Sequence, residues 1–560
     1  MMDPITLEVL WNRLVAVVNE QAAALVRTSF SSIVREAGDL SAGIFDCRGR
    51  MIAQAVTGTP GHINSMATSI HHFLAVYPPD KLDPGDVLIT NNPWQTSGHL
   101  NDLTVITPVF RGNDLIGFFG NTCHAIDIGG RILSAEAREV FEEGLHIPIS
   151  KLYVAGQPNE DLIKIVRGNV RAPDQVVGDM RAQVAANDVG SRRLLDFLEE
   201  FGLEDIEDVA DEVVGRSESA MRAAIAAIPD CSCDNEVWSD GFEEPVHVKV
   251  RVDIHGDELT VDFAGSSPQS SRGINVVMNY THAYTTYAVK CAISPDVPNN
   301  EGSFRPVKVV APLGSILNAQ YPAPVAARHI LGHFLPGAVF GALAKIIPDR
   351  VMAEGSAGLW GIHMQGHDMH DRPFVYIFFL GGGTGARPTS DGLSATAFPS
   401  GVSGTPVEVI ESLSPVVVGR KELREDSGGP GKFRGGLGQT MSLRMRTKRP
   451  WVVSAISDRL LFPASGYAGG KSGAKGDIVL HTGDHSKPKQ LLVLPPDGQV
   501  AMHLPGGGGC GNSFERDPTL VLDDVRNGLV SAESAREDYG AVIVGDDVDD
   551  AATLELRRNP

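Results

Sequence analysis

The sequence has no uninterrupted apolar run approaching the roughly 18 residues that a membrane-spanning helix requires. Its first residues, Met1-Met2-Asp3-Pro4, also lack the basic and apolar parts of a signal peptide. We therefore expect a cytoplasmic protein that does not associate with a membrane.

Cysteine is scarce as well, since the chain has only six in 560 residues and they are scattered. A disulfide framework needs closely spaced cysteines in a short chain, so a small secreted scaffold is excluded. Cys231 and Cys233 are too isolated to form a zinc knuckle, and we interpret them as structural or incidental.

Positive charge is in deficit, with 48 Lys and Arg against 69 Asp and Glu and a formal net charge of −21. This balance repels phosphate backbones and argues against nucleic-acid binding. The length is sufficient for two or three domains with substantial cores. These limits are consistent with a large soluble enzyme subunit.

Two clusters of metal-ligand side chains lie close together in the sequence, at Gly98–Asp102 (GHLND) and Cys123–Gly130 (CHAIDIGG). The residues between them predict two buried strands, at Leu103–Phe110 and Leu115–Phe119, joined by a polar turn. Such a hairpin would bring the two clusters to the same end of a sheet.

At that sheet end, His99, Asp102 and His124 would converge. Two imidazoles and a carboxylate can hold a borderline divalent ion. The alternative is a surface pair, because a lone His-x-x-Asp is usually hydrogen-bonded without a metal.

The first part of the chain is mainly helical in pattern. Apolar residues recur at helical spacing after Pro4, which predicts a long amphipathic helix packed against a strand at Leu40–Phe45. A second helix is expected at Ile63–Val76. A third, charged stretch at Gly190–Ala227 predicts helix with breaks at Gly202 and Gly215.

Beyond Pro229 the pattern changes to alternating segments, and from Phe374 onward glycine-rich turns separate short strands. We therefore predict an α+β, multidomain fold, with a mixed N-terminal half that binds metal and a mostly β, glycine-rich C-terminal half. The expected domains are 1–229 (α/β, with the metal site), 230–372 (α+β) and 373–560 (glycine-rich and mostly β).

Several sequence blocks follow one another along nearly the whole chain. They include Arg35–Ser41 (REAGDLS), Gly98–Asp102, His124–Gly130, Glu143–Leu145, Asp262–Gln269 (DFAGSSPQ), Pro406–Glu411, Asp426–Gly438 (DSGGPGKFRGGLG), Leu504–Gly511 and Glu515–Pro518. In this order they resemble the hydantoinase B/oxoprolinase family. Co-ordered blocks over this length are far more specific than any one block.

The resemblance implies the beta subunit of an ATP-dependent cyclic-amide hydrolase of the hydantoinase, oxoprolinase or caprolactamase kind. It places the metal shell on Asp39, His99, Asp102 and His124. Zinc is the first choice for this shell, and manganese is the alternative because two carboxylates tolerate a harder ion.

Three further residues are candidates for catalytic roles. His62 either contacts substrate or is a turn histidine bonded to the backbone. Asp127 either orients His124 or caps a turn. Glu143 is either a general base or a solvated helix carboxylate.

A lactam or ureide carbonyl is a poor electrophile, so coupling of its hydrolysis to ATP is useful. The resemblance implies that a hydantoinase A-like ATPase alpha subunit phosphorylates the carbonyl oxygen, in an (αβ)2 assembly. The activated small molecule would then meet the metal centre, where bound water has a pKa lowered toward ~7.

Two other functions are compatible with the same ligand set. One is a subunit of an ATP-dependent ketone carboxylase of the acetone or acetophenone kind, which the resemblance reaches more distantly. The other is a scaffold subunit that has lost catalysis and keeps the ion for stability.

The glycine-rich segments do not predict a nucleotide site in this chain. Gly469-Gly470-Lys471-Ser472 resembles the end of a Walker motif, but Ser465 occupies the position of the required earlier glycine. Gly506–Gly511 matches a dinucleotide fingerprint formally, yet no helix follows it directly. We expect these glycines to permit tight turns and close backbone approach instead.

A rival metal site would use His363, His367 and His370, which have the spacing of one helix face. Four glycines between positions 355 and 366 argue against a helix there, so we interpret these histidines as structural.

One departure from the family pattern, at Asn92, bears on which substrate the protein prefers. Asn92 stands where many members have Asp, and Trp94 adds an aromatic ring to the same loop. If this loop borders the substrate, it favours a neutral cyclic amide with an apolar face. The alternative is that Asn92 only stabilises the turn before Pro93.

Overall fold

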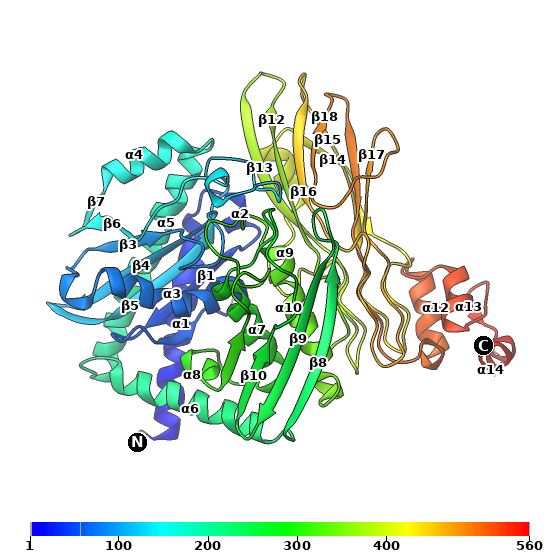
Figure 1. Cartoon of the computed structure of the whole chain (residues 1–560), viewed down its shortest axis with the longest axis horizontal. Coiled ribbons are helices and arrows are strands. Elements are labelled where there is room, and N and C mark those ends of the chain that lie inside the picture. Colours follow the sequence, from blue (N-terminus) through cyan, green and yellow to red (C-terminus); the bar gives the residue numbers. More distant parts are fainter. Residues whose placement is uncertain (1–2, 57, 559–560) are drawn as a thin grey trace. The chain divides into compact units, whose positions relative to one another are not determined.

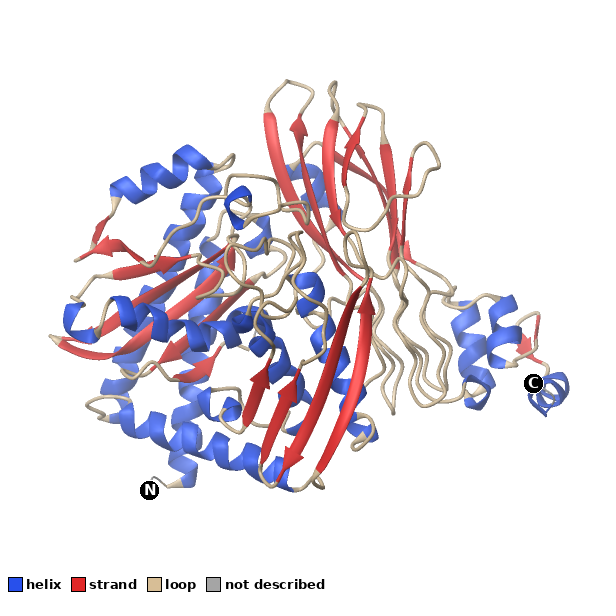
Figure 2. Cartoon of the chain, viewed as in Figure 1, coloured by secondary structure: helices blue, strands red, loops and turns tan. Residues whose placement is uncertain are grey.

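The computed structural model describes residues 3–56 and 58–558. It divides into two compact units. The first comprises Met1–Asp234, Val250–Pro336 and Gly401–Ser403, and the second comprises Asn235–Lys249, Gly337–Ser400 and Gly404–Pro560. The expected segment 230–372 contributes to both units. The predicted α+β, multidomain class is confirmed by the mixture of helices and several separate sheets (Figure 2).

The first unit is built on a seven-stranded antiparallel sheet in the order β2-β1-β5-β4-β3-β6-β7 (Figure 1). The predicted strand at Leu40–Phe45 is β1, and the predicted hairpin is β4 and β5. The strands are β1 (Leu40–Phe45), β2 (Met51–Gln54), β3 (Val87–Thr90), β4 (Asp102–Arg111), β5 (Asp114–His124), β6 (Ser150–Val154) and β7 (Gln157–Pro158).

Helices cover both faces of this sheet, which is why β4 is buried at nearly every position. Phe118 and Phe119 of β5 point to opposite faces. Phe118 joins the cluster under α3, whereas Phe119 packs against Gly190 of α5. The helices of this unit are α1 (Pro4–Thr28), α2 (Ser32–Arg35), α3 (Pro60–Val76), η1 (Pro79–Lys81), η2 (Val140–Glu142), α4 (Glu160–Asn169), α5 (Pro173–Phe201), α6 (Glu207–Ala226), α7 (Met278–Ile293), α8 (Glu301–Phe304) and α9 (His329–Gly332).

Local sequence signals explain most helix ends. Asp3 caps α1 by accepting a hydrogen bond from the Thr6 amide at 3.0 Å, and Pro4 occupies the first turn. Gly202 ends α5 in a left-handed conformation, as predicted. The predicted break at Gly215 is wrong, because Gly215 lies inside α6. An interior glycine costs a helix only about 1 kcal/mol, which the buried face of α6 offsets.

A four-stranded sheet has the order β11-β10-β9-β8. Its strands are β8 (Cys231–Ser239), β9 (Val246–His255), β10 (Glu258–Asp262) and β11 (Val307–Val310). β10 pairs with β9 antiparallel and with β11 in parallel.

The second unit contains two four-stranded sheets, in the orders β13-β12-β16-β18 and β14-β15-β19-β17. One apolar cluster, which includes Trp360, Tyr376 and Trp451, draws on strands of both sheets. The elements are α10 (Phe334–Leu343, which begins in the first unit), η3 (Pro348–Arg350), β12 (Leu359–His367), β13 (Pro373–Gly381), α11 (Val407–Leu413), β14 (Val416–Leu423), β15 (Gln439–Met445), β16 (Trp451–Ile456), β17 (Asp477–Leu480), β18 (Leu491–Leu494), β19 (Gln499–His503) and η4 (Ser513–Glu515).

The end of the chain is helical around a small cluster that includes Val521 and Tyr539 (Figure 1). It comprises α12 (Pro518–Arg526), α13 (Ala532–Tyr539), β20 (Ile543–Val544), β21 (Asp547–Val548) and α14 (Asp550–Arg558). None of the helices within 3–56 and 58–558 combines the length and the apolar character that a membrane crossing requires.

Glycine-rich segments of the second unit run side by side as extended backbone without forming sheets (Figure 2). A Cβ atom on Gly383 would lie 1.8 Å from the carbonyl oxygen of Gly436, and one on Gly507 would lie 1.9 Å from that of Thr384. Only glycine allows such approach.

These segments also satisfy each other's backbone groups. Each amide of Gly506–Gly511 donates to a carbonyl oxygen elsewhere in the unit, as do the amides of Gly470 and Lys471. A phosphate cradle needs amides that are open to the ligand. The geometry therefore agrees with the rejection of both nucleotide motifs. His363 and His367 lie on strand β12, so the helix required by the rival histidine site does not form.

Candidate metal centre

The strand register of the first unit brings distant residues to one sheet end. Asp102, the first residue of β4, pairs with His124, the last residue of β5. Leu40, the first residue of β1, pairs with Cys123, so Asp39 lies beside His124. His99 lies in the turn that leads directly into β4. All four predicted ligands therefore meet at this end of the sheet.

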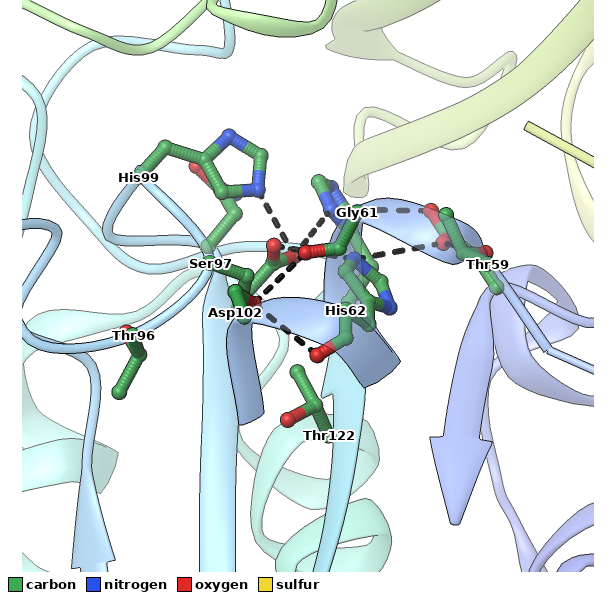
Figure 3. Close-up of polar contacts among 12 residues, drawn as sticks. Thr59, Gly61, His62, Thr96, Ser97, His99, Asp102 and Thr122 are labelled. Atoms are coloured by element: carbon green, nitrogen blue, oxygen red, sulfur yellow. Dashed lines mark hydrogen bonds and ion pairs between the residues drawn. The ribbon is translucent and has the colours of Figure 1, made fainter. Parts of the chain in front are cut away.

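Asp102 lies at the middle of the cluster, and its oxygens face several polar side chains (Figure 3). Its Oδ1 is 2.7 Å from His99 Nε2 and 3.1 Å from His124 Nδ1. Donor atoms of these three residues all lie within 4.8 Å of one another, and all three residues are buried. This is the spacing expected of ligands around one cation.

Asp39 lies slightly farther out. Its Oδ2 is 3.9 Å from His124 Nδ1, and its Oδ1 accepts a hydrogen bond from Thr59 Oγ1 at 3.2 Å. The backbone carbonyl of Asp39 accepts from the His124 amide at 3.2 Å, which ties the two residues together. Asp39 thus offers a second carboxylate at the edge of the cluster.

The protonation of His99 is set by its surroundings. Its Nδ1 donates to the carbonyl oxygen of Ala326 at 3.0 Å. Burial and the nearby Arg328 lower the pKa of His99 to about 4, so the ring is neutral and carries only that proton. Its Nε2 forms no aligned hydrogen bond with any described residue, although Asp102 Oδ1 is 2.7 Å away. Two Lewis bases this close fit a shared cation, and the backbone bond is typical of a metal-ligating histidine.

His62 enters the cluster from the first turn of α3. Its Nε2 is 3.0 Å from Asp102 Oδ2 and 3.7 Å from Asp39 Oδ1. Burial alone would lower the pKa of His62, but the charges of Asp102 and Asp39 overcome it and raise that pKa. The structure therefore places the His62 ring against the carboxylates of Asp102 and Asp39. The interpretation as a turn histidine bonded only to the backbone does not account for these contacts.

Arg328 is a site residue that the sequence did not indicate. Its guanidinium pairs with Asp102 Oδ2 and donates to the Ser97 carbonyl, and it lies 4.1 Å above the ring of Tyr280. Burial would raise the pKa of Asp102, yet His62, His99 and Arg328 together hold it well below its ordinary value. Asp102 is therefore a carboxylate.

Two more buried histidines follow Arg328 and were also missed. Burial, followed by the proximity of His333 and Arg328, lowers the pKa of His329 well below its usual value. His333 Nε2 lies 3.1 Å from the hydroxyl of Tyr284, and burial lowers the pKa of His333 to about 3. Both rings are neutral, so they add polar atoms but no charge.

Asp127 and Glu143 lie in the loops that follow β5. Asp127 pairs with Arg171 at 2.7 Å and accepts from the Gly129 amide at 3.3 Å, which holds the turn after His124. Its effect on the His124 ring stays a prediction. Glu143 is 4% exposed, so it is not a solvated carboxylate, and burial raises its pKa to about 8.

The turn that precedes His99 is ordered by Asn92, whose Oδ1 accepts from the Trp94 amide at 3.0 Å. The Trp94 indole nitrogen donates to the Ala319 carbonyl oxygen, and its ring packs edge-on against Tyr321. Asn92 therefore performs the turn role that was the alternative interpretation. A contact of this loop with substrate stays a prediction.

A family model for "Hydantoinase B/oxoprolinase" matches residues 3–513. The chain belongs to this family. The match covers all four proposed ligands and both sheets of the second unit, so the resemblance inferred from separate sequence blocks is confirmed over most of the chain.

Two relatives that are similar over nearly their entire length are named as subunits of enzymes. The chain is 32% identical to one subunit of a putative D-/L-hydantoinase of Pseudomonas sp. (strain NS671), covering 99% of this chain and 98% of that protein. It is 33% identical to the beta subunit of the caprolactamase of Pseudomonas jessenii, with 98% of each covered. The crystal structure of the ATP-dependent caprolactamase from P. jessenii matches with a TM-score of 0.91 at 30% identity over all of both chains.

Proposed function

We propose that this chain is the metal-binding catalytic subunit of an ATP-dependent cyclic-amide hydrolase of the hydantoinase, lactamase or oxoprolinase type. The observation that carries the proposal is the convergence of His99, Asp102 and His124 around one point, with Asp39 at its edge. The names of the relatives supply the reaction class.

Zinc is the proposed ion, and manganese is the alternative, because two imidazoles and two carboxylates suit both. When bound, the ion supplies a Lewis acid and a water of lowered pKa. His99 is oriented for this task by its bond to the Ala326 carbonyl oxygen. Arg328 compensates part of the charge of Asp102 and Asp39, so a divalent ion leaves the centre with an excess positive charge.

His62 is the proposed acid–base group. It lies against Asp102 and Asp39, whose charges raise its pKa above the ordinary value. A histidine in this position can hold a proton near the reacting atoms and release it as the reaction proceeds. Asp127 is proposed to support His124 through the turn that it anchors.

A second protein is proposed to provide ATP chemistry. The relatives are named as single subunits of their enzymes, and the glycine-rich segments of this chain engage their own amides in backbone bonds. A hydantoinase A-like ATPase would phosphorylate the substrate carbonyl and pass it to the metal centre. The proposed assembly is (αβ)2, and the proposed location is the cytoplasm.

Metal analysis of the purified chain tests the centre directly. We expect about one zinc or manganese ion per chain in the wild type and strong loss in His124→Ala. His367→Ala is the matched control, because His367 belongs to the rival histidine group on β12. Equal metal content in wild type and His124→Ala would refute the assignment, and selective loss in His367→Ala would move the site to the second unit.

The reaction class is tested with the chain co-expressed with its ATPase partner. Hydantoin, 5-oxoproline, caprolactam, acetone and acetophenone are each assayed with ATP, with and without labelled bicarbonate. Ring opening of a cyclic amide is the expected result. Net carboxylation of a ketone without any ring opening would instead establish a carboxylase component, and a fully inert complex that retains its metal would indicate a scaffold.

A further inference from the structure

Glu143 holds a loop that also contacts the proposed metal centre. Its Oε1 accepts hydrogen bonds from the amides of Val325 and Ala326, at 2.6 and 2.8 Å. Its Oε2 forms no hydrogen bond with the residues that the structure describes. One oxygen of the Glu143 carboxyl group thus satisfies two consecutive buried amides, which fixes the direction of the chain at this point.

The same loop carries two contacts to the proposed metal centre. The carbonyl oxygen of Ala326 accepts the Nδ1 proton of His99 at 3.0 Å. Two residues later, Arg328 pairs with Asp102, and its amide donates to the Val325 carbonyl oxygen within the same turn. Movement of the loop would therefore disturb both the proposed ligand His99 and Arg328, which is the counter-charge of the proposed ligand Asp102.

Close packing holds Glu143 itself in place. Its amide donates to the Val140 carbonyl oxygen, and Leu145 is bonded to Ile128. A Cβ atom on Gly130 would lie 2.8 Å from the carbonyl carbon of Glu143, so the turn after His124 is pressed against this backbone. The turn after His124 thus supports Glu143, and Glu143 in turn supports the loop that contains Val325 and Ala326.

We propose that Glu143 is a positioning residue that holds the Val325–Arg328 loop in register, and thereby orients His99 and Arg328 toward Asp102. It does not exchange a proton with the substrate. This inference rests on the proposed function, since it assigns Glu143 a task at the proposed metal centre. It replaces the general-base role, which was one of the two alternatives that the sequence left open for Glu143.

Two substitutions separate the two roles. Glu143→Gln keeps the Oε1 acceptor and the size of the side chain but abolishes acid–base chemistry. Glu143→Ala removes the acceptor and leaves two buried amides unpaired, which the loop can relieve only by moving. Glu142→Gln is the control, because Glu142 is the preceding residue and pairs with Arg131 at the surface.

The experiment measures zinc affinity by chelator competition, together with kcat, KM and the pH profile of the reconstituted complex. We expect Glu143→Gln to match the wild type and the control within about twofold in zinc affinity and kcat, with the same pH profile. Glu143→Ala should bind zinc about 10- to 100-fold more weakly, as is usual when a group that orients a ligand is lost. Should the Ala variant fail to fold, Glu143→Met replaces it, because Met keeps the length without an oxygen acceptor.

Two results would overturn the inference. If Glu143→Gln lost most of its kcat while zinc affinity stayed normal, Glu143 would be a general base. If Glu143→Ala or Glu143→Met kept wild-type zinc affinity, the loop would not depend on Glu143. Both differ from failure of the proposed function, in which the wild-type chain itself would bind no metal or the wild-type complex would open no cyclic amide.

Discussion

Glu143 makes the stability of the protein depend on pH at the scale of one residue. Its pKa is about 8 in the folded protein and near 4.5 when exposed. Between these values the unfolded chain releases the proton and the folded chain keeps it. The contribution of Glu143 to the free energy of unfolding is therefore fully present below pH 4.5. It is lost progressively as the pH rises toward 8.

The side chain in the Glu143→Gln variant cannot titrate, so the variant does not lose this part of its free energy of unfolding as the pH rises. We expect its free energy of unfolding, relative to the wild type, to improve by about 1.4 kcal/mol per pH unit between pH 4.5 and 8. The difference should be constant outside that range. Denaturant unfolding at several pH values across and below this range checks this, and a difference that does not change with pH would show that Glu143 ionises normally in the folded chain.

Arg328 provides a second prediction at the residue scale. Its removal leaves the buried Asp102 with less counter-charge, which typically destabilises a protein by about 3 kcal/mol or more. Arg328 has no atom that can ligate a metal, so Arg328→Met should keep about one bound ion while it loses stability and activity. Arg328→Lys is the matched variant, because it retains the charge without the planar guanidinium. Loss of metal in both variants alike would show that Arg328 is required for ion binding itself.

The sequence predicted the ligand-type residues but not their partners. His99, Asp102 and His124 stand in two clusters marked by residue type and spacing, whereas Asp39 was assigned through the resemblance to the family. Arg328 lies in an alanine-rich segment with no such block, and its contact with Asp102 spans 226 positions. A contact of this kind depends on tertiary packing, which local patterns do not contain. A local residue related to this contact is Gly98, because a Cβ atom there would lie 2.7 Å from Arg328 Cδ.

At the scale of elements, the glycine-rich segments determine the stability of the second unit. We expect Gly383→Ala to destabilise this unit by about 3 kcal/mol or more, because the added Cβ meets rigid backbone at 1.8 Å. Gly404→Ala is the matched control, since a Cβ there meets nothing within 4 Å. Thermal unfolding compares the two variants, and metal content should remain normal in both. Equal melting temperatures would mean that the segments can separate at little cost.

Elements with one clear periodicity were predicted well. The strand β1 was predicted with its observed bounds, and the hairpin β4–β5 was recognised from two apolar runs and a polar turn. Gly215 was misjudged because a single glycine weakens a helix less than the burial of its apolar face stabilises it. The extended glycine-rich segments could not be predicted as an array, because their bonds join residues far apart in sequence.

At the scale of the whole molecule, removal of the ion should act on one unit. A bound ligand stabilises the folded state by about 2.7 kcal/mol at a concentration of about 100 times Kd. We therefore expect chelation to increase hydrogen exchange at the ends of β4 and β5 and in Val325–Arg328. Exchange in β12 and β13 of the second unit should stay unchanged, and it serves as the internal control. Equal loss of protection in both units would contradict a metal centre confined to the first.

The isolated chain should not hydrolyse ATP. The amides of Gly506–Gly511 and of Lys471 are engaged with backbone carbonyls, so these segments cannot wrap a phosphate without breaking the array. Phosphate release by the chain purified alone is the measurement, and the complex with the proposed ATPase partner is the positive control. Turnover by the chain alone, at the rate of the complex, would place the nucleotide site here.

The contact between His99 and Ala326 spans 227 positions, and it has a consequence for the order of events during synthesis. All four proposed ligands precede residue 125, whereas Ala326 and Arg328 are added about two hundred residues later. At about 5 to 20 residues per second, the ribosome needs roughly 10 to 40 s to bridge that interval. At the proposed metal centre, an ion that arrived early would meet a His99 ring still free to turn and an Asp102 carboxylate not yet paired with Arg328. The proposed centre would therefore acquire its final preference among metals only after most of the first unit has left the ribosome.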